Sequence, residues 1–135
     1  MKAPIGRRIT AFLIDETIAG VIVIFFGVLG FTALTVVQNT FVGLLGLLII
    51  LFGLMASVAF NLVKDALFSG RGVGKKFMRL RVVKSDGSTC DYVSSALRNI
   101  TIIIPFIGVI ELILPLTDSQ GYRMGDKIAK TQVVE

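Results

Sequence analysis

The sequence predicts an all-α integral membrane protein: a two-helix transmembrane hairpin, a third helical region at the membrane and a small strand pairing outside it. Two observations predict this fold class. Hydrophobic residues fill 54% of the 135 positions and the mean hydropathy is +0.84. A chain of this length cannot bury so much apolar surface alone, so lipid must cover part of it. Moreover, two apolar stretches are long enough to cross a bilayer, and basic residues stand only at their outer ends.

The first predicted spanning helix covers about residues 9–37. Its stretch from Thr17 to Val37 has 21 residues without a charge, and about 20 residues suffice to cross a bilayer. Asp15 and Glu16 stand just before this stretch, behind two arginines. An ionised carboxylate in hydrocarbon is costly unless it is paired, hydrated or protonated. These charges therefore predict either a solute path or structural pairing.

The second predicted spanning helix covers about residues 41–63, which contain no charged side chain. Only Gln38, Asn39 and Thr40 separate the two helices. A connection this short joins antiparallel neighbours, so the two spans form a hairpin.

The basic residues predict the orientation of the hairpin. They precede the first span and follow the second, and the short turn has none. By the positive-inside rule, the N-terminus and a loop over 64–92 are cytoplasmic. The same residues explain the net charge of +5 through anionic lipid headgroups rather than nucleic acid. The basic residues that flank the two spans are Lys2, Arg7, Arg8, Lys64, Arg71, Lys75, Lys76, Arg79, Arg81 and Lys84.

Two short stretches predict a small cytoplasmic sheet. Apolar and basic residues alternate over 78–83, and residues 131–134 form a second β-type run. A single short strand is marginal, so we expect the two runs to pair. The Gly-rich run before the first strand lacks the phosphate-loop spacing and predicts a basic turn at lipid headgroups.

The third apolar region, residues 93–116, has two interpretations. It is long enough to cross, but a crossing would place the basic tail 117–135 outside and separate the two strands. Pro105 favours two helical arms that enter the membrane, or lie at its interface, and return. We prefer this re-entrant or interfacial hairpin to a third full span, and treat residues 1–135 as one domain.

Three motifs in order resemble the RDD family. They are Arg8-x-x-Ala-x-x-Ile-Asp15, then Gly72-x-Gly-Lys-Lys76 followed by Leu-Arg-Val-Val83, then Asp126-Lys-x-Ala-x-Thr-x-Val-Val134. The resemblance runs nearly end to end. It implies a small bacterial or archaeal membrane protein of proposed transport function, since some members are described as sodium/proton antiporters.

The family is named for one arginine and two aspartates. By match, these are Arg8, with Arg7 as a close competitor, Asp15 and Asp126. The sequence departs from common members at Gly125, where a histidine often stands, and at Val73, where many members have Ser or Thr. Neither departure affects the three named residues.

Arg8 and Asp15 are seven residues apart, about 10 Å along one helix face, which is too far for a direct pair. We expect Arg8 to pair with Asp126. Asp15 then has two interpretations: it bonds a polar group such as Asn61, Arg98 or Asn99, or it carries a proton or a cation.

Other charged residues are secondary candidates. Glu16 faces another element or a second protomer, and Asp65 is expected to pair with Lys64 or Arg98. Glu111 could add an oxygen to a cation site, but a carboxylate reaching water at the interface is the preferred interpretation. With no histidine and one cysteine, the sequence predicts no metal site, no cofactor and no enzyme.

These observations favour a small transporter of the prokaryotic inner membrane, with cation/proton exchange at Asp15. Two spans cannot enclose a path, so we expect a multi-pass homo-oligomer with both termini cytoplasmic. The alternative is a non-transporting accessory or scaffold protein that binds a partner protein or anionic lipid through its basic face. That face consists of Arg71, Lys75, Lys76 and Arg79.

Overall fold

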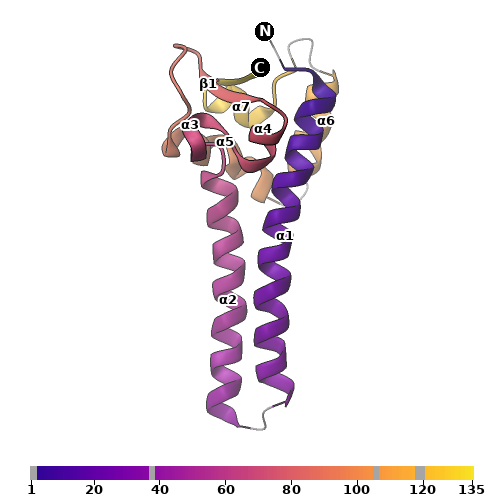
Figure 1. The fold of residues 1–135 in the computed structure, drawn as a ribbon, viewed down its shortest axis with the longest axis vertical. Coiled ribbons are helices and arrows are strands. Elements are labelled where there is room, and N and C mark those ends of the chain that lie inside the picture. Colours follow the sequence, from indigo (N-terminus) through magenta and orange to yellow (C-terminus); the bar gives the residue numbers. More distant parts are fainter. Residues whose placement is uncertain (1–2, 37–38, 105–106, 118–120) are drawn as a thin grey trace. The chain divides into compact units, whose positions relative to one another are not determined.

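The computed structural model describes residues 3–36, 39–104, 107–117 and 121–135 (Figure 1). The chain forms two compact bodies. One contains residues 16–60, and the other contains residues 1–15 together with residues 61–135.

The two long helices are α1 (Ile5–Val36) and α2 (Thr40–Val63), both long and apolar enough to cross a membrane. The predicted helices at 9–37 and 41–63 are thus present, although Val37 and Gln38 lie outside the described residues. Helix α1 begins earlier than predicted because Pro4, a residue favoured in a first turn, accepts a hydrogen bond from the Arg8 N–H at 3.2 Å. The Asn39 side chain starts α2 by accepting the N–H of Phe41 at 2.9 Å.

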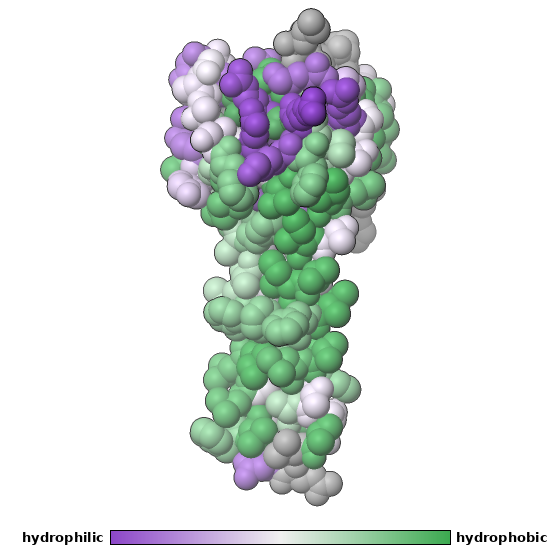
Figure 2. All heavy atoms as spheres, in the orientation of Figure 1, coloured by the Kyte–Doolittle hydropathy of each residue, from purple (hydrophilic) through white to green (hydrophobic). Residues whose placement is uncertain are grey.

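Within residues 16–60 the two helices run side by side (Figure 1). Gly30 and Gly46 let the backbones meet, since a Cβ on Gly30 would lie 2.5 Å from the Gly46 carbonyl oxygen. The ring of Phe26 covers Gly53 and meets Phe52 edge-on, with 5.3 Å between ring centroids. Most other apolar side chains point outward, and the hairpin surface in Figure 2 is mostly green. This apolar surface suits contact with lipid.

The second body contains the remaining elements. They are α3 (Leu67–Gly70), α4 (Val73–Phe77), β1 (Arg81–Lys84), α5 (Tyr92–Ile103), α6 (Ile107–Thr117), α7 (Met124–Ile128) and β2 (Thr131–Val134). Strands β1 and β2 pair antiparallel, with Val82 opposite Val133, which confirms the predicted pairing. Strand β1 begins at Arg81 rather than at residue 78 because the chain first closes α4 and turns at Arg79, whose φ is +57°.

The third apolar region forms two helices rather than one. Helices α5 and α6 have 12 and 11 residues, and about 20 are needed to span a bilayer. The Asp91 side chain accepts the Ser94 N–H at 2.8 Å and so begins α5. Pro105, the expected break, lies outside the described residues. The entry of these helices into the membrane stays a prediction.

The segments α4–β1 and α7–β2 are two copies of one arrangement, here called the two arms. Each residue of the second arm stands 51 positions after its counterpart, as Gly125 does after Gly74. Both glycine carbonyls accept the N–H four residues later at 3.0 Å, and both helices end in a positive-φ residue before the strand. Because Val82 pairs with its own counterpart Val133, a local two-fold axis passes through that pair.

The interior of this body is only partly apolar. A small cluster surrounds the strands, and charged residues fill much of the rest. The apolar members are Ala3, Ala11, Leu80, Val82, Cys90 and Val133. The fully buried polar and charged members are Asp15, Lys64, Asp65, Ser95, Asn99, Glu111 and Asp126. Buried charges must be paired, and their pairing defines the candidate site.

Candidate functional site: a buried chain of charges

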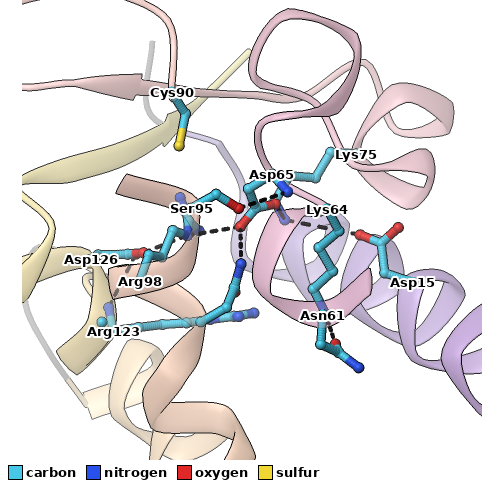
Figure 3. A network of polar contacts seen from close by, with 12 residues as sticks. Asp15, Asn61, Lys64, Asp65, Lys75, Cys90, Ser95, Arg98, Arg123 and Asp126 are labelled. Atoms are coloured by element: carbon cyan, nitrogen blue, oxygen red, sulfur yellow. Dashed lines mark hydrogen bonds and ion pairs between the residues drawn. The ribbon is translucent and has the colours of Figure 1, made fainter. Parts of the chain in front are cut away.

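Six side chains of alternating sign, five buried and one partly buried, follow one another through the second body. Figure 3 labels the five buried members. We call this series the charge chain. In order of contact it consists of Arg8, Asp126, Arg98, Asp65, Lys75 and Asp15. No member's side chain is more than 9% exposed. The series begins and ends on α1, and its three positive and three negative charges balance.

Asp126, at the start of α7, connects two arginines. Its Oδ2 lies 2.9 Å from Nη2 of Arg8, and its Oδ1 lies 3.0 Å from Nη2 of Arg98. Oδ2 also accepts the backbone N–H of Arg123 at 3.2 Å, which caps α7. The expected pairing of Arg8 with Asp126 is confirmed. Arg7 instead forms an exposed pair with Glu135 at 2.9 Å.

Asp65, in the turn after α2, is the second carboxylate that joins two cations of the charge chain. Its Oδ2 lies 3.1 Å from both Nε of Arg98 and Nδ2 of Asn99, and its Oδ1 binds the ammonium of Lys75. Burial alone raises the pKa of Asp65, but Lys75 and Arg98 outweigh it and hold the pKa well below its usual range. The expected Asp65–Arg98 pair is confirmed, and the Lys64 ammonium donates to Asn61 Oδ1 at 2.6 Å.

Lys75 is not part of an exposed basic face, contrary to the sequence-based expectation. Only 7% of it is exposed, and its ammonium lies between Asp65 and Asp15. Burial lowers its pKa, and the two carboxylates work against that shift. Successive helix residues point about 100° apart, so Lys75 faces inward while Lys76 is exposed.

Asp15 ends the charge chain with one oxygen satisfied and one not. Oδ1 accepts the Gly74 N–H at 2.7 Å. Oδ2 lies 4.0 Å from Nζ of Lys75 and has no hydrogen-bond partner among the described residues. Gly74 can come this close because it has no Cβ, and a Cβ there would collide with the backbone carbonyl of Ala11.

Asn61, Arg98 and Asn99 were alternative partners for Asp15, and two of these alternatives, Arg98 and Asn99, are wrong. Both bind Asp65 instead, because the Arg98 guanidinium is held between the carboxylates of Asp65 and Asp126. The third expected partner, Asn61, accepts a hydrogen bond from Lys64.

Glu111 does not reach water, so the preferred interpretation of this residue is wrong. It is 1% exposed, and its Oε1 accepts the Gly125 N–H at 2.9 Å. Its Oε2 has no hydrogen-bond partner within the described ranges. Glu111 therefore relates to Gly125 of the second arm as Asp15 relates to Gly74 of the first.

Two cations lie over the ring of Phe12, an arrangement that the sequence did not indicate. Nζ of Lys64 lies 5.3 Å from the ring centroid, and the guanidinium carbon of Arg123 lies 5.1 Å from it. Arg123 is 8% exposed, and burial lowers its pKa. The half-buried Glu16 follows Phe12 by one turn of α1.

Two other kinds of site find no support in the described part of the chain. It contains no group of three or more His, Cys, Asp or Glu that could hold a metal ion. Cys90 is buried, and burial raises the pKa of its thiol to about 11, so it stays a protonated, unreactive thiol at neutral pH.

A family model, that of the RDD family, matches residues 2–130. The chain belongs to the RDD family. No curated protein and no solved structure matches it. In this RDD protein, the arginine and two aspartates matched to the family name are members of one charge chain: Arg8 and Asp15 are its ends, and Asp126 joins two of its arginines.

Proposed function

We propose that this RDD protein is a carrier that exchanges a monovalent cation such as Na⁺ for protons, with Asp15 as the exchanging group. One observation carries the proposal: Asp15 is fully buried, its Oδ2 has no hydrogen-bond partner among the described residues, and the Lys75 ammonium lies 4.0 Å from that oxygen. A buried oxygen in this state gains free energy when a proton or a cation binds to it.

In this proposal, the other two named residues position α7 against α1 rather than carry the ion. Both oxygens of Asp126 already lie within 3.0 Å of an arginine, so a further cation would have to displace one. Arg8 also donates to the Gly121 carbonyl. Two charge-assisted contacts from one guanidinium fix its position.

The proposal includes a membrane topology. Two spanning helices cannot enclose an ion path, so the carrier acts as a homo-oligomer. We place the protein in a prokaryotic plasma membrane as a multi-pass protein, with both termini cytoplasmic by the positive-inside rule. Helices α5 and α6 then lie at or partly within the cytoplasmic interface.

The test is Asp15→Asn in purified protein reconstituted into lipid vesicles. With an imposed pH gradient and Na⁺ outside, wild-type vesicles should exchange Na⁺ for protons, and the variant should lose nearly all of that flux. Asp86→Asn, in the exposed turn after β1, is the matched control and should transport normally. Wild-type flux in a folded Asp15→Asn protein would exclude Asp15 as the exchanging group.

A second candidate function rests on a different observation. A groove of about 450 Å³ is lined by Phe68, Val73, Lys76, Phe77 and Arg79. Phe77 is 73% exposed, and Nζ of Lys76 lies 4.5 Å from the Phe68 ring centroid. Exposed aromatic rings beside cations suit an anionic lipid, as in an accessory protein that transports nothing.

The carrier and the accessory function predict different losses: cation flux depends on Asp15, whereas lipid binding depends on Lys76 and Arg79. Native mass spectrometry of detergent-solubilised protein should show Lys76→Gln/Arg79→Gln retaining less phosphatidylglycerol than wild type, and equal phosphatidylcholine. Arg81→Gln, an exposed cation on β1, is the control. If wild-type vesicles move no cation while this lipid preference holds, the accessory function replaces the carrier.

A further inference from the structure

We propose that Lys75 is the displaceable counter-ion of Asp15: its ammonium moves from Asp65 to Asp15 when Asp15 is ionised, and a bound cation takes its place. The inference rests on the proposed exchange at Asp15 and names the group with which the cation competes. It assigns a binding role to a residue outside the three matched to the family name.

The positions of three atoms carry the inference. Nζ of Lys75 contacts Oδ1 of Asp65 and lies 4.0 Å from Oδ2 of Asp15. A hydrogen bond from an ammonium to a carboxylate is about 2.8 Å long, so a movement of roughly 1 Å would complete one. The oxygen it would reach has no hydrogen-bond partner among the described residues.

Asp65 can release Lys75 without becoming unpaired. Its Oδ2 keeps Arg98 and Asn99, each at 3.1 Å. Asp15 accepts a hydrogen bond from one neutral donor, the Gly74 N–H, when Lys75 is on Asp65. The ammonium is thus shared between a carboxylate that has a second ionic partner and a carboxylate held by a backbone N–H.

The surrounding charges set the balance between the two positions. Arg98 on α5 repels Lys75, while Asp65 and Asp15 attract it. Lys64, after α2, attracts Asp15, and Asp65 repels it. A proton or a cation on Asp15 removes the attraction there and leaves Lys75 on Asp65.

The local two-fold axis supports the choice of Lys75 independently. Lys75 occupies the position in the first arm that Asp126 occupies in the second, directly after the glycine that binds a buried carboxylate. Each arm therefore contributes one charged residue to the charge chain. Asp126 is held by two arginines, whereas Lys75 presents a single compact ammonium on a flexible stem. The lysine is the arm residue that can change partners.

The exchange involves no covalent step. With Asp15 ionised and paired to Lys75, the pair is neutral. When Na⁺ binds to Asp15, the ammonium returns to Asp65 and the site gains one positive charge. When a proton binds instead, Asp15 becomes neutral and Lys75 again stays on Asp65, with the same gain of charge. Proton and cation thus compete for one state of the site, as exchange requires.

The first test is Lys75→Gln in the vesicle flux assay, with Lys130→Gln, an exposed lysine of the second arm, as control. Without the ammonium, ionised Asp15 loses its counter-charge. The pH midpoint of Na⁺ flux should rise by about one unit or more, and the KM for Na⁺ above that midpoint should fall several-fold. The control should keep both wild-type values. A folded Lys75→Gln protein with the wild-type midpoint and KM would overturn the proposal.

The second test needs no transport. In protein labelled with ¹⁵N-lysine in detergent micelles, adding NaCl in place of N-methylglucamine chloride should shift the ammonium signal of Lys75. Because Lys64 is also buried, the Lys75 signal is assigned as the one that is missing from Lys75→Gln. The shift should vanish in Asp15→Asn. If the Lys75 ammonium signal of the wild type does not change on addition of Na⁺, the inference is overturned. A wild type that moves no cation in vesicles but shows the shift would instead overturn the proposed function.

Discussion

Asp65 is a carboxylate with no exposed surface, and Lys75 and Arg98 keep it ionised. Arg98 and Asn99 occupy one oxygen and Lys75 the other. Removing one partner of a buried ion pair leaves the other charge uncompensated, and this costs about 3–5 kcal/mol. The stability of the second body should therefore depend strongly on the ionisation of this single group.

The pH dependence follows from the lowered pKa of Asp65. Because the folded value lies below that of the unfolded chain, about 3.9, the stabilisation is complete above this range and declines as the pH falls toward the folded value. The melting temperature of wild type should exceed that of Asp65→Asn at pH 7, and the gap should narrow below about pH 4. Thermal unfolding of both proteins in detergent, from acidic to neutral pH, measures this difference in melting temperature. A difference in melting temperature that stays constant over that pH range would show that the ionisation of Asp65 does not stabilise the protein.

Residue pairs were predictable from the sequence where burial and opposite charge left few choices. The pairs of Arg8 with Asp126 and of Asp65 with Arg98 are of this kind. The burial of Lys75 and Glu111 was not predicted. Lys75 stands beside the exposed Lys76 in a five-residue helix, too short for periodicity to show which residue faces inward.

At the level of elements, the close approach of the two arms to neighbouring helices depends on Gly74 and Gly125. A Cβ at either position would collide with a backbone carbonyl, that of Ala11 or that of Arg98. Backbone cannot move aside as a flexible side chain can. The N–H that each glycine gives to a buried carboxylate would also be lost if the arm moved away.

Gly74→Ala and Gly6→Ala should therefore have opposite effects. Overpacking at Gly74 should destabilise the protein by about 1–3 kcal/mol or more. A Cβ on Gly6, in the first turn of α1, would have no neighbouring heavy atom within 4 Å, so alanine there should be neutral or stabilise by up to about 1 kcal/mol. Thermal unfolding of both variants in one detergent checks this. Equal changes in stability from Gly74→Ala and Gly6→Ala would show that Gly74 is not tightly packed against the Ala11 backbone.

The long helices and the strand pairing were predictable, because hydropathy and alternation extend over enough residues to show a period. The short helices α3, α4 and α7 were not, since four or five residues form a stable helix only through tertiary contacts. The repeat was readable in principle. Gly-Lys-Lys-Phe-Met-Arg-Leu-Arg-Val-Val from Gly74 aligns without a gap with Gly-Asp-Lys-Ile-Ala-Lys-Thr-Gln-Val-Val from Gly125.

At the scale of the whole chain, the composition predicted the class and could not predict the function. Mean hydropathy and two long apolar stretches indicate a membrane protein whatever it does. The charge chain depends on contacts between residues up to 118 positions apart, which no local pattern contains. Which of the buried carboxylate oxygens lack a hydrogen bond is likewise visible only in the three-dimensional arrangement.

Deleting residues 122–135, which removes α7 and β2, tests the role of the second arm. Arg8 and Arg98 would lose Asp126, and Val82 would lose its partner Val133. We expect residues 64–121 to become sensitive to protease in detergent, while α1 and α2 stay protected. Glu135→Gln removes only the exposed pair with Arg7, worth at most about 1 kcal/mol, and should digest like wild type. A truncated protein as resistant as wild type would contradict this role.

The charge chain also fixes an order of events during synthesis. Arg8 and Asp15 are translated long before Asp126, their most distant companion in the series. Until the second arm is made, the charged start of α1 lacks one of its partners and is more stable in water than among apolar groups. The hairpin can form before the second arm is synthesised, but the polar interior can close only after it. We therefore expect insertion of the spans and closure of the interior to be separate steps in the maturation of this protein.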